Sequence, residues 1–185
     1  MKKYLFILML ALGGCAGKAT ESNQVYLLLE TQQPQIASQS APLLVVEVEL
    51  APYLDVNGIV YRTSDTSIVE AKQNQWAMSL ADMVEDSTID TLRANQTKYW
   101  PVNLEPSLNL ADSHKLLIKL DRFNGSFQGN AEISGEWLLI DKRGDIAEGA
   151  PFSYKAVLTE EGYPSLVEAL SLTLEQSVAT ISRAL

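Results

Sequence analysis

Cys15 is the only cysteine of the chain, and its surroundings determine what its thiol can do. A basic start and a short apolar run occupy residues 2–12. Directly before the cysteine stand the three residues of a lipobox, Leu12, Gly13 and Gly14. This order is typical of a bacterial lipoprotein signal peptide, and the apolar run is far shorter than the ~20 residues of a membrane-spanning helix. We therefore expect residues 1–14 to be removed and Cys15 to carry the acyl chains.

The composition restricts both the partners and the sources of stability. The net charge of −9 disfavours nucleic acid as a partner, because an acidic surface is repelled by phosphate groups. With Cys15 used for the anchor, no thiol remains for a disulfide or a thiolate metal site. Residues 15–24 form a short tether before a domain over residues 25–185. Ala16 fits sorting to the outer membrane, so we expect the domain at its periplasmic face.

The only histidine, His114, follows Asp112 and Ser113, which raises the possibility of a catalytic triad. Adjacent residues of an extended segment point to opposite faces, however, so these three side chains cannot form the required relay. No G-x-S-x-G motif accompanies them. We interpret His114 as a solvent-exposed loop residue and expect no catalytic residues, so the sequence predicts no enzyme.

Acidic residues offer two further candidates for chemistry. Asp55, Asn57 and Gly58 resemble the start of a calcium loop, but its later ligands are absent, so we interpret the segment as a turn. A predicted helix also carries four carboxylates on one face, Asp82, Glu85, Asp86 and Asp90. A solvent-exposed acidic face is the simplest interpretation of that spacing. The sequence therefore predicts neither a metal nor a cofactor.

Apolar runs and polar–apolar alternation predict the strands that would position these groups. The predicted strands cover residues 25–29, 43–50, 59–63, 67–71, 115–123, 131–140 and 152–158. Turn-forming residues separate several of them, and a loop is expected to begin at Asn124.

Two segments have helical periodicity. The first covers residues 75–95 and includes Trp76 and Leu80 on its apolar face. The second begins near Pro164 and repeats an apolar residue every three or four positions at Tyr163, Val167, Leu170, Leu174, Val178, Ile181 and Leu185. This stripe could form a coiled coil, but packing on the chain's own sheet is preferred. We predict an α+β fold, with a single domain in which a mixed or antiparallel sheet packs against two long amphipathic helices.

Several motifs occur together in the mature chain. They are the opening Tyr26-Leu27-Leu28, the stretch VEVELAPYLDVNGIVYR over residues 46–62, Trp76, Asp121-Arg122-Phe123 and Gly135-Glu136-Trp137-Leu138-Leu139. With the lipobox, this set resembles the PqiC-like (YmbA-type) auxiliary lipoproteins of MCE-type ABC transport systems. Ala51 departs from the pattern, since leucine is expected before the proline.

The resemblance implies an outer-membrane lipoprotein that docks on the periplasm-spanning MCE protein of an inner-membrane complex. Such systems move phospholipids or other apolar molecules between membranes, and the resemblance suggests a ring-like homo-oligomer without enzymatic activity. The residues shared with the family are interpreted as packing positions: Pro52, Tyr53, Leu54, Trp76 and Trp137.

If the protein works by assembly, part of its apolar surface must lie outside the core of the monomer. Leu117, Leu138 and Ile140 occupy outward phases of predicted strands, and Trp100 lies outside every inward pattern. These four are the candidate oligomer or partner contacts. An activator or scaffold of a periplasmic cell-envelope enzyme is the alternative, although the short tether counts against it. A ligand carrier or hydrolase would need an enclosed pocket or a nucleophile with its base, and the sequence places neither.

Replacing Cys15 with serine tests the predicted anchor. The Cys15→Ser chain has no acyl acceptor, so it should leave the membrane fraction for the soluble fraction, because lipid chains supply the stable attachment. Cell fractionation followed by immunoblotting measures the distribution. A variant that remains fully membrane-bound would contradict lipid anchoring at this residue.

Overall fold

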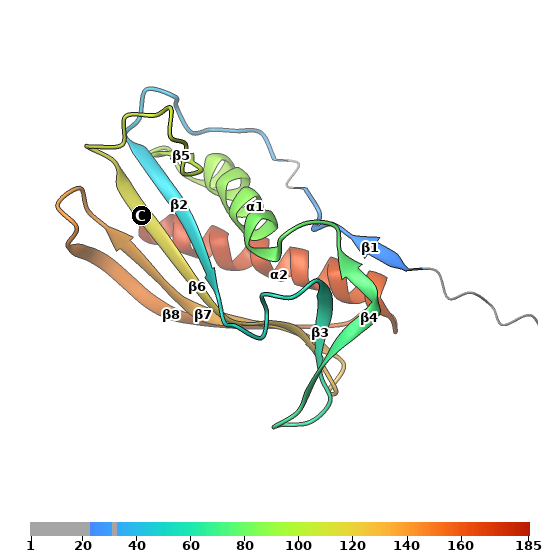
Figure 1. Cartoon of the computed structure of the whole chain (residues 1–185). Coiled ribbons are helices and arrows are strands. Elements are labelled where there is room, and N and C mark those ends of the chain that lie inside the picture. The colour runs from blue at the N-terminus through green and yellow to red at the C-terminus, as the bar shows by residue number, and fades with distance from the viewer. Residues whose placement is uncertain (1–22, 31–32) are drawn as a thin grey trace, which may run out of the picture.

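Strand β6 (His114–Ser126) lies at the centre of a mixed eight-stranded sheet (Figure 1). The computed structural model describes residues 23–30 and 33–185. Along one side, β6 pairs antiparallel with β7 (Asn130–Ile140), which pairs with the edge strand β8 (Ile146–Val157). The lipobox and Cys15 lie outside the described residues, so the predicted signal peptide and lipid attachment remain predictions.

The other side of β6 is shared by two branches of the sheet. The first half of β6 pairs in parallel with β2 (Leu43–Leu50), which continues to β5 (Trp100–Val102). The last two residues of β6 pair in parallel with β3 (Gly58–Arg62). From there the sheet continues to β4 (Ile68–Trp76) and to β1 (Gln24–Tyr26). Parallel and antiparallel pairs therefore coexist, which confirms the predicted mixed sheet.

Helices α1 (Leu80–Asn95) and α2 (Tyr163–Ala184) both lie on the same face of this sheet (Figure 1). Helix α1 covers β2 and β5, helix α2 covers β7 and β8, and the two helices pack against each other. The predicted stripe of α2 is buried, with no more than 5% of any of these side chains exposed: Val167, Leu170, Leu174, Val178 and Ile181. Because the stripe is used inside the monomer, it is not available for a coiled coil.

A bulge in β6 keeps apolar residues on the helix side along the whole strand. Leu116, Ile118 and Leu120 are at most 1% exposed, and the register with β7 then shifts between Leu120 and Arg122. The shift turns Phe123 inward, where it is 1% exposed. Gly135 on β7 lies opposite this point, and a Cβ there would overlap the Lys119 carbonyl oxygen. Leu120 and Phe123 both point inward with two residues between them, as expected where a bulge inserts one residue.

Several predicted boundaries were wrong. Helix α1 begins at Leu80 instead of residue 75, because the Ser79 hydroxyl accepts a hydrogen bond from the Asp82 amide at 3.5 Å and caps the helix there. Trp76 therefore belongs to the end of β4, and its ring packs 6.1 Å from that of Phe123. It is a buried sheet residue and not part of the helix.

The turn between β6 and β7 also lies later than predicted. Strand β6 continues through Asn124 to Ser126, and the chain reverses where Gly129 adopts a φ of 75°. Glycine accepts this left-handed conformation without strain. Strand β8 starts at Ile146, six residues before its predicted beginning, because pairing along the full length of β7 satisfies its backbone groups.

Candidate interaction surface

Three of the predicted contact residues share the face of the sheet that the helices leave uncovered. Leu117 of β6 pairs with Leu138 of β7, which in turn pairs with Gly149 of β8. Ile140 lies one row further along the same face, opposite Lys115. Leu117, Leu138 and Ile140 are each half-buried. The structure therefore brings these three side chains together, as alternation along adjacent strands requires.

Ion pairs border the two leucines on this face. Lys115 contacts Glu47 at 2.9 Å, and Lys119 contacts Glu136 at 3.4 Å. All four side chains are between 33% and 48% exposed, so each pair contributes at most about 1 kcal/mol to stability. These pairs make the surface amphipathic, with an apolar centre and a charged border.

A loop narrows the apolar area at the end where Ile140 lies. It leaves a groove of about 360 Å³ lined by Val45, Leu104, Leu110 and Ile140. Val45 is only 3% exposed although it points away from the helices, whereas Leu104 is 60% exposed. The loop thus lies beside Ile140, and the Leu117–Leu138 pair lies outside this groove.

Trp100, the fourth predicted contact, lies apart from this group. It is on β5, which β2 separates from β6. The ring is half-buried, and the Arg93 guanidinium lies 4.5 Å from its centroid. Arg93 also donates hydrogen bonds to the Pro101 carbonyl at 2.8 and 3.2 Å. A cation–π contact therefore already occupies one side of the indole.

Of the five residues interpreted as packing positions, four lie in or against the core. Leu54, Trp76 and Trp137 are 1%, 7% and 5% exposed. Tyr53 is half-buried, and its hydroxyl donates to the Asp121 carbonyl at 2.5 Å, which ties the turn after β2 to the bulge of β6. Pro52 is exposed in that turn, so its interpretation as a packing position was wrong.

The sequence did not predict a buried charge cluster on the same sheet. The Glu132 carboxylate of β7 is 2% exposed and accepts hydrogen bonds from Arg62 at 2.6 Å and from Lys155 at 2.9 Å. Arg122 lies 3.7 Å away. In the sequence, Arg62 and Arg122 stand out only as parts of the motifs over residues 46–62 and 121–123. Their partner was hidden because Glu132 occupies an outward phase, where a solvent-exposed carboxylate is the ordinary expectation.

These cations determine the protonation of Glu132. Burial by itself raises the pKa of the carboxyl, but hydrogen bonds from Lys155 and Arg62 and their charges outweigh burial, so the pKa lies below its ordinary value of 4.5. The carboxylate is therefore ionised at neutral pH. Through these cations the Glu132 carboxylate links β3, β6, β7 and β8, on the same sheet face as the Leu117–Leu138 pair.

The structure does not assemble a triad around His114. The Ser113 hydroxyl donates to the Leu110 carbonyl at 2.8 Å, and the Asp112 carboxylate lies 3.9 Å from Lys142. His114 begins β6, is half-buried and packs against the Tyr99 ring at 5.1 Å. The prediction of a solvent-exposed loop histidine was therefore wrong, since pairing with β2 extends the strand to this residue.

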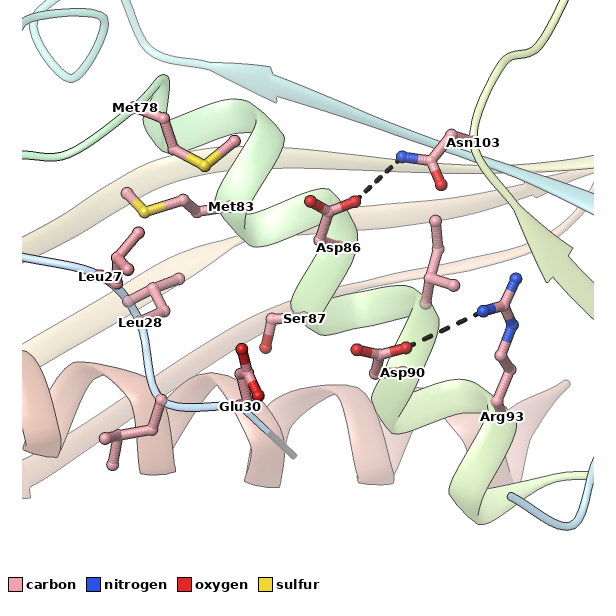
Figure 2. Close-up of a pocket in the computed structure, with 12 residues that line it drawn as sticks. Leu27, Leu28, Glu30, Met78, Met83, Asp86, Ser87, Asp90, Arg93 and Asn103 are labelled. Carbon is pink, nitrogen blue, oxygen red and sulfur yellow. Dashed lines mark hydrogen bonds and ion pairs between the residues drawn. The ribbon is translucent and has the colours of Figure 1, made fainter. Parts of the chain in front are cut away.

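The acidic face of α1 borders a groove of about 320 Å³ (Figure 2). Asp86 accepts a hydrogen bond from Asn103 at 3.1 Å, and Asp90 lies 3.9 Å from Arg93. Burial raises the pKa of Glu85, and the nearby Asp86 and Asp82 raise it further. Within residues 23–30 and 33–185, no group of His, Cys, Asp or Glu side chains is arranged to hold a metal ion. In the same residues no helix is long and apolar enough to cross a bilayer.

Comparison with known proteins identifies the family. The sequence profile of the ABC-type transport auxiliary lipoprotein components matches residues 26–182. The chain belongs to this family. It is 34% identical over 186 aligned positions to the intermembrane transport lipoprotein PqiC of Escherichia coli (strain K12), covering 99% of this chain and 97% of that relative. PqiC of Shigella flexneri matches equally well.

Solved structures have the same architecture as this auxiliary lipoprotein. One crystal structure of an uncharacterized protein is 29% identical, with a TM-score of 0.73 over 88% of this chain and 98% of the other. A protein of Xanthomonas campestris is 18% identical, with a TM-score of 0.69 over 86% of this chain and 92% of the other. The second likeness concerns the fold alone.

The Glu132 cluster makes a prediction about stability and pH. The Glu132→Gln variant should lose about 2 kcal/mol of unfolding free energy at pH 7, because three cations lose a buried negative partner. Because the pKa of Glu132 is lowered in the folded state, its ionised carboxylate stabilises the fold above pH 4.5. This contribution is lost as the pH falls through the folded-state pKa. The difference between wild type and variant should therefore shrink in acid, as measured by urea unfolding from pH 7 down to pH values below 4.5.

Glu136→Gln is the matched control on the same strand. Its carboxylate is 48% exposed in the pair with Lys119, so the change should cost no more than about 1 kcal/mol. Equal losses in both variants, or a Glu132 difference that grows in acid, would contradict the assigned role of the cluster.

Proposed function

We propose that this lipoprotein is a non-enzymatic docking and assembly component of an MCE-type intermembrane lipid transport system. It is anchored through Cys15 at the periplasmic face of the outer membrane and binds the MCE-domain protein of an inner-membrane complex. The full-length similarity to PqiC, whose name describes an intermembrane transport lipoprotein, supports this assignment. It is the component that holds other proteins in place.

The observation that carries the proposal is the Leu117–Leu138 pair on the uncovered face of the sheet. Both side chains are half-buried between the Lys115–Glu47 and Lys119–Glu136 ion pairs. Apolar centres with polar borders are the usual arrangement of protein–protein interfaces. A soluble monomer has no need of such a centre, whereas an assembling subunit does.

The same surface supports assembly into a ring. A ring requires a heterologous contact, in which one face of each copy meets a different face of the next copy. The outer face of β6 and β7 would supply one such surface, because both helices lie on the other face of the sheet (Figure 1). Ring-like homo-oligomerisation is therefore part of the proposal.

Co-purification tests the proposed partner. The detergent-solubilised lipoprotein should capture an MCE-domain protein and its inner-membrane complex, identified by mass spectrometry. A Cys15→Ser chain prepared from the soluble fraction distinguishes specific capture from detergent micelle mixing. Capture of a cell-wall synthase instead would support the alternative function, an activator or scaffold of a periplasmic cell-envelope enzyme.

Charged substitutions test the assembling surface. Leu117→Asp together with Leu138→Asp places two carboxylates in the centre of the contact, so the particle mass measured by light scattering should fall to that of the monomer. The core should survive, because neither side chain faces the helices. Ile36→Asp is the control, since Ile36 is 54% exposed in the segment before β2. An unchanged mass in the double variant would overturn the assigned surface.

A further inference from the structure

The first described segment carries a row of exposed aliphatic side chains. Val25, Leu27 and Leu29 are 65%, 60% and 51% exposed. The residues between them point inward, and Leu28 is only 9% exposed. A segment that alternates in this way normally has polar residues on its outer side. A segment that is apolar on both sides needs a second apolar environment besides the core.

The segment is attached to the domain by several backbone contacts. Tyr26 pairs with Trp76 of β4, and its carbonyl accepts a hydrogen bond from the Ala77 amide at 2.9 Å. The Leu29 amide donates to the Ser171 hydroxyl of α2 at 3.0 Å. The same hydroxyl donates to the Val167 carbonyl at 2.8 Å, so it is fixed from both sides. The exposed row is therefore held against the domain, with Val25 in β1 and with Leu27 and Leu29 in the segment that follows it.

Met78 extends this apolar surface toward the start of α1. Its side chain is 46% exposed, and it lines the groove of about 320 Å³ together with Leu27 and Leu29. Figure 2 shows Met78 and Met83 on the side of the groove near Leu27 and Leu28, with Asp86 and Asp90 further along α1. We name Val25, Leu27, Leu29 and Met78 the apolar ridge.

The position of the ridge in the chain indicates its partner. Cys15, the expected site of the acyl chains, stands eight residues before Asn23, where the described segment begins. Eight residues span at most about 29 Å even when fully extended, so the ridge is never far from the bilayer that holds the anchor. Among the exposed apolar side chains of the described residues, Val25, Leu27 and Leu29 are the nearest along the chain to Cys15.

We propose that the apolar ridge rests on the surface of the membrane that holds the anchor, at the boundary between headgroups and acyl chains. This inference rests on the lipid attachment in the proposed function. Acyl chains alone tether a domain without orienting it, whereas a second shallow contact restricts its rotation. The ridge would then hold the domain in one orientation, with β1 and the start of α1 toward the bilayer.

The charges near the ridge specify the type of bilayer. Three carboxylates line the groove beside it, Glu30, Asp86 and Asp90, against one cation, Arg93, which lies 3.9 Å from Asp90. These carboxylates would be repelled by anionic headgroups. Contact should therefore be stronger on a zwitterionic surface than on one rich in anionic lipid.

A fluorescent label at the ridge tests the contact in the intact lipoprotein. Lipidation consumes the thiol of Cys15, so a cysteine introduced as Leu27→Cys is the only free thiol of the mature chain. The labelled protein is reconstituted into phosphatidylcholine vesicles that contain nitroxide-bearing acyl chains. Quenching at position 27 should be several-fold greater than in the Val157→Cys control, whose native side chain is 78% exposed on β8. Adding phosphatidylglycerol should reduce the quenching at position 27.

Each outcome distinguishes the two proposals. Mass spectrometry of the same sample reports the acyl groups on Cys15. Acylated protein with equal quenching at both positions would overturn the ridge contact and leave the anchor intact. A label at position 27 that is shielded from water but not quenched by the lipid would show a protein contact and would equally overturn it. Protein without acyl groups would overturn the anchor and the ridge proposal with it.

Discussion

The constraint on which this structure depends is that two helices cover only one face of an eight-stranded sheet. Burial of that face supplies the stability of a domain that has no disulfide available. Phe123, Leu170 and Leu174, each at most 1% exposed, illustrate how completely the sheet and α2 exclude water from one another. The face that the helices leave uncovered must satisfy its side chains in other ways.

The sheet face without helices contains two different regions along its length. Beside the N-terminal half of β6 lies the Leu117–Leu138 pair, between the Lys115–Glu47 and Lys119–Glu136 ion pairs. Past the bulge it becomes the Glu132 cluster, in which one buried carboxylate is shared by Arg62, Arg122 and Lys155. The bulge at Asp121 separates the two regions, because it changes which side chains point outward. The first region is suited to a protein contact, and the second joins β3 to the consecutive strands β6, β7 and β8.

The two apolar surfaces used in the proposals above lie on different parts of the fold. The Leu117–Leu138 pair belongs to the outer face of the sheet, whereas the apolar ridge belongs to β1 and the chain around the start of α1 (Figure 1). A subunit that must contact a neighbouring protein and also remain near a bilayer needs two such surfaces. The acidic face of α1 lies beside the second one and limits the lipid it can approach.

Local physical rules accounted for both helices and most strands of this protein, although several predicted boundaries were wrong. The helical stripe of α2, the inward phase of Leu116, Ile118 and Leu120, and strand β2 from Leu43 to Leu50 are all present in the sequence as periodicity, and the structure confirms them. The outward phases of Leu117, Leu138 and Ile140 could be inferred in the same way. Periodicity identifies a face because side-chain direction repeats at 2 residues in a strand and at about 3.6 in a helix.

Only the tertiary structure decided the features that depend on pairing between distant segments. Trp76 belongs to β4 because its backbone pairs with β1, although its spacing from Leu80 fits a helix. His114 is drawn into β6 by β2, and Glu132 is buried by cations from three other strands. Hydrogen-bond partners and counter-ions supplied by other parts of the chain leave no periodic signal near the residue itself. The sequence determined which residues face the core, and the fold determined which of the others meet.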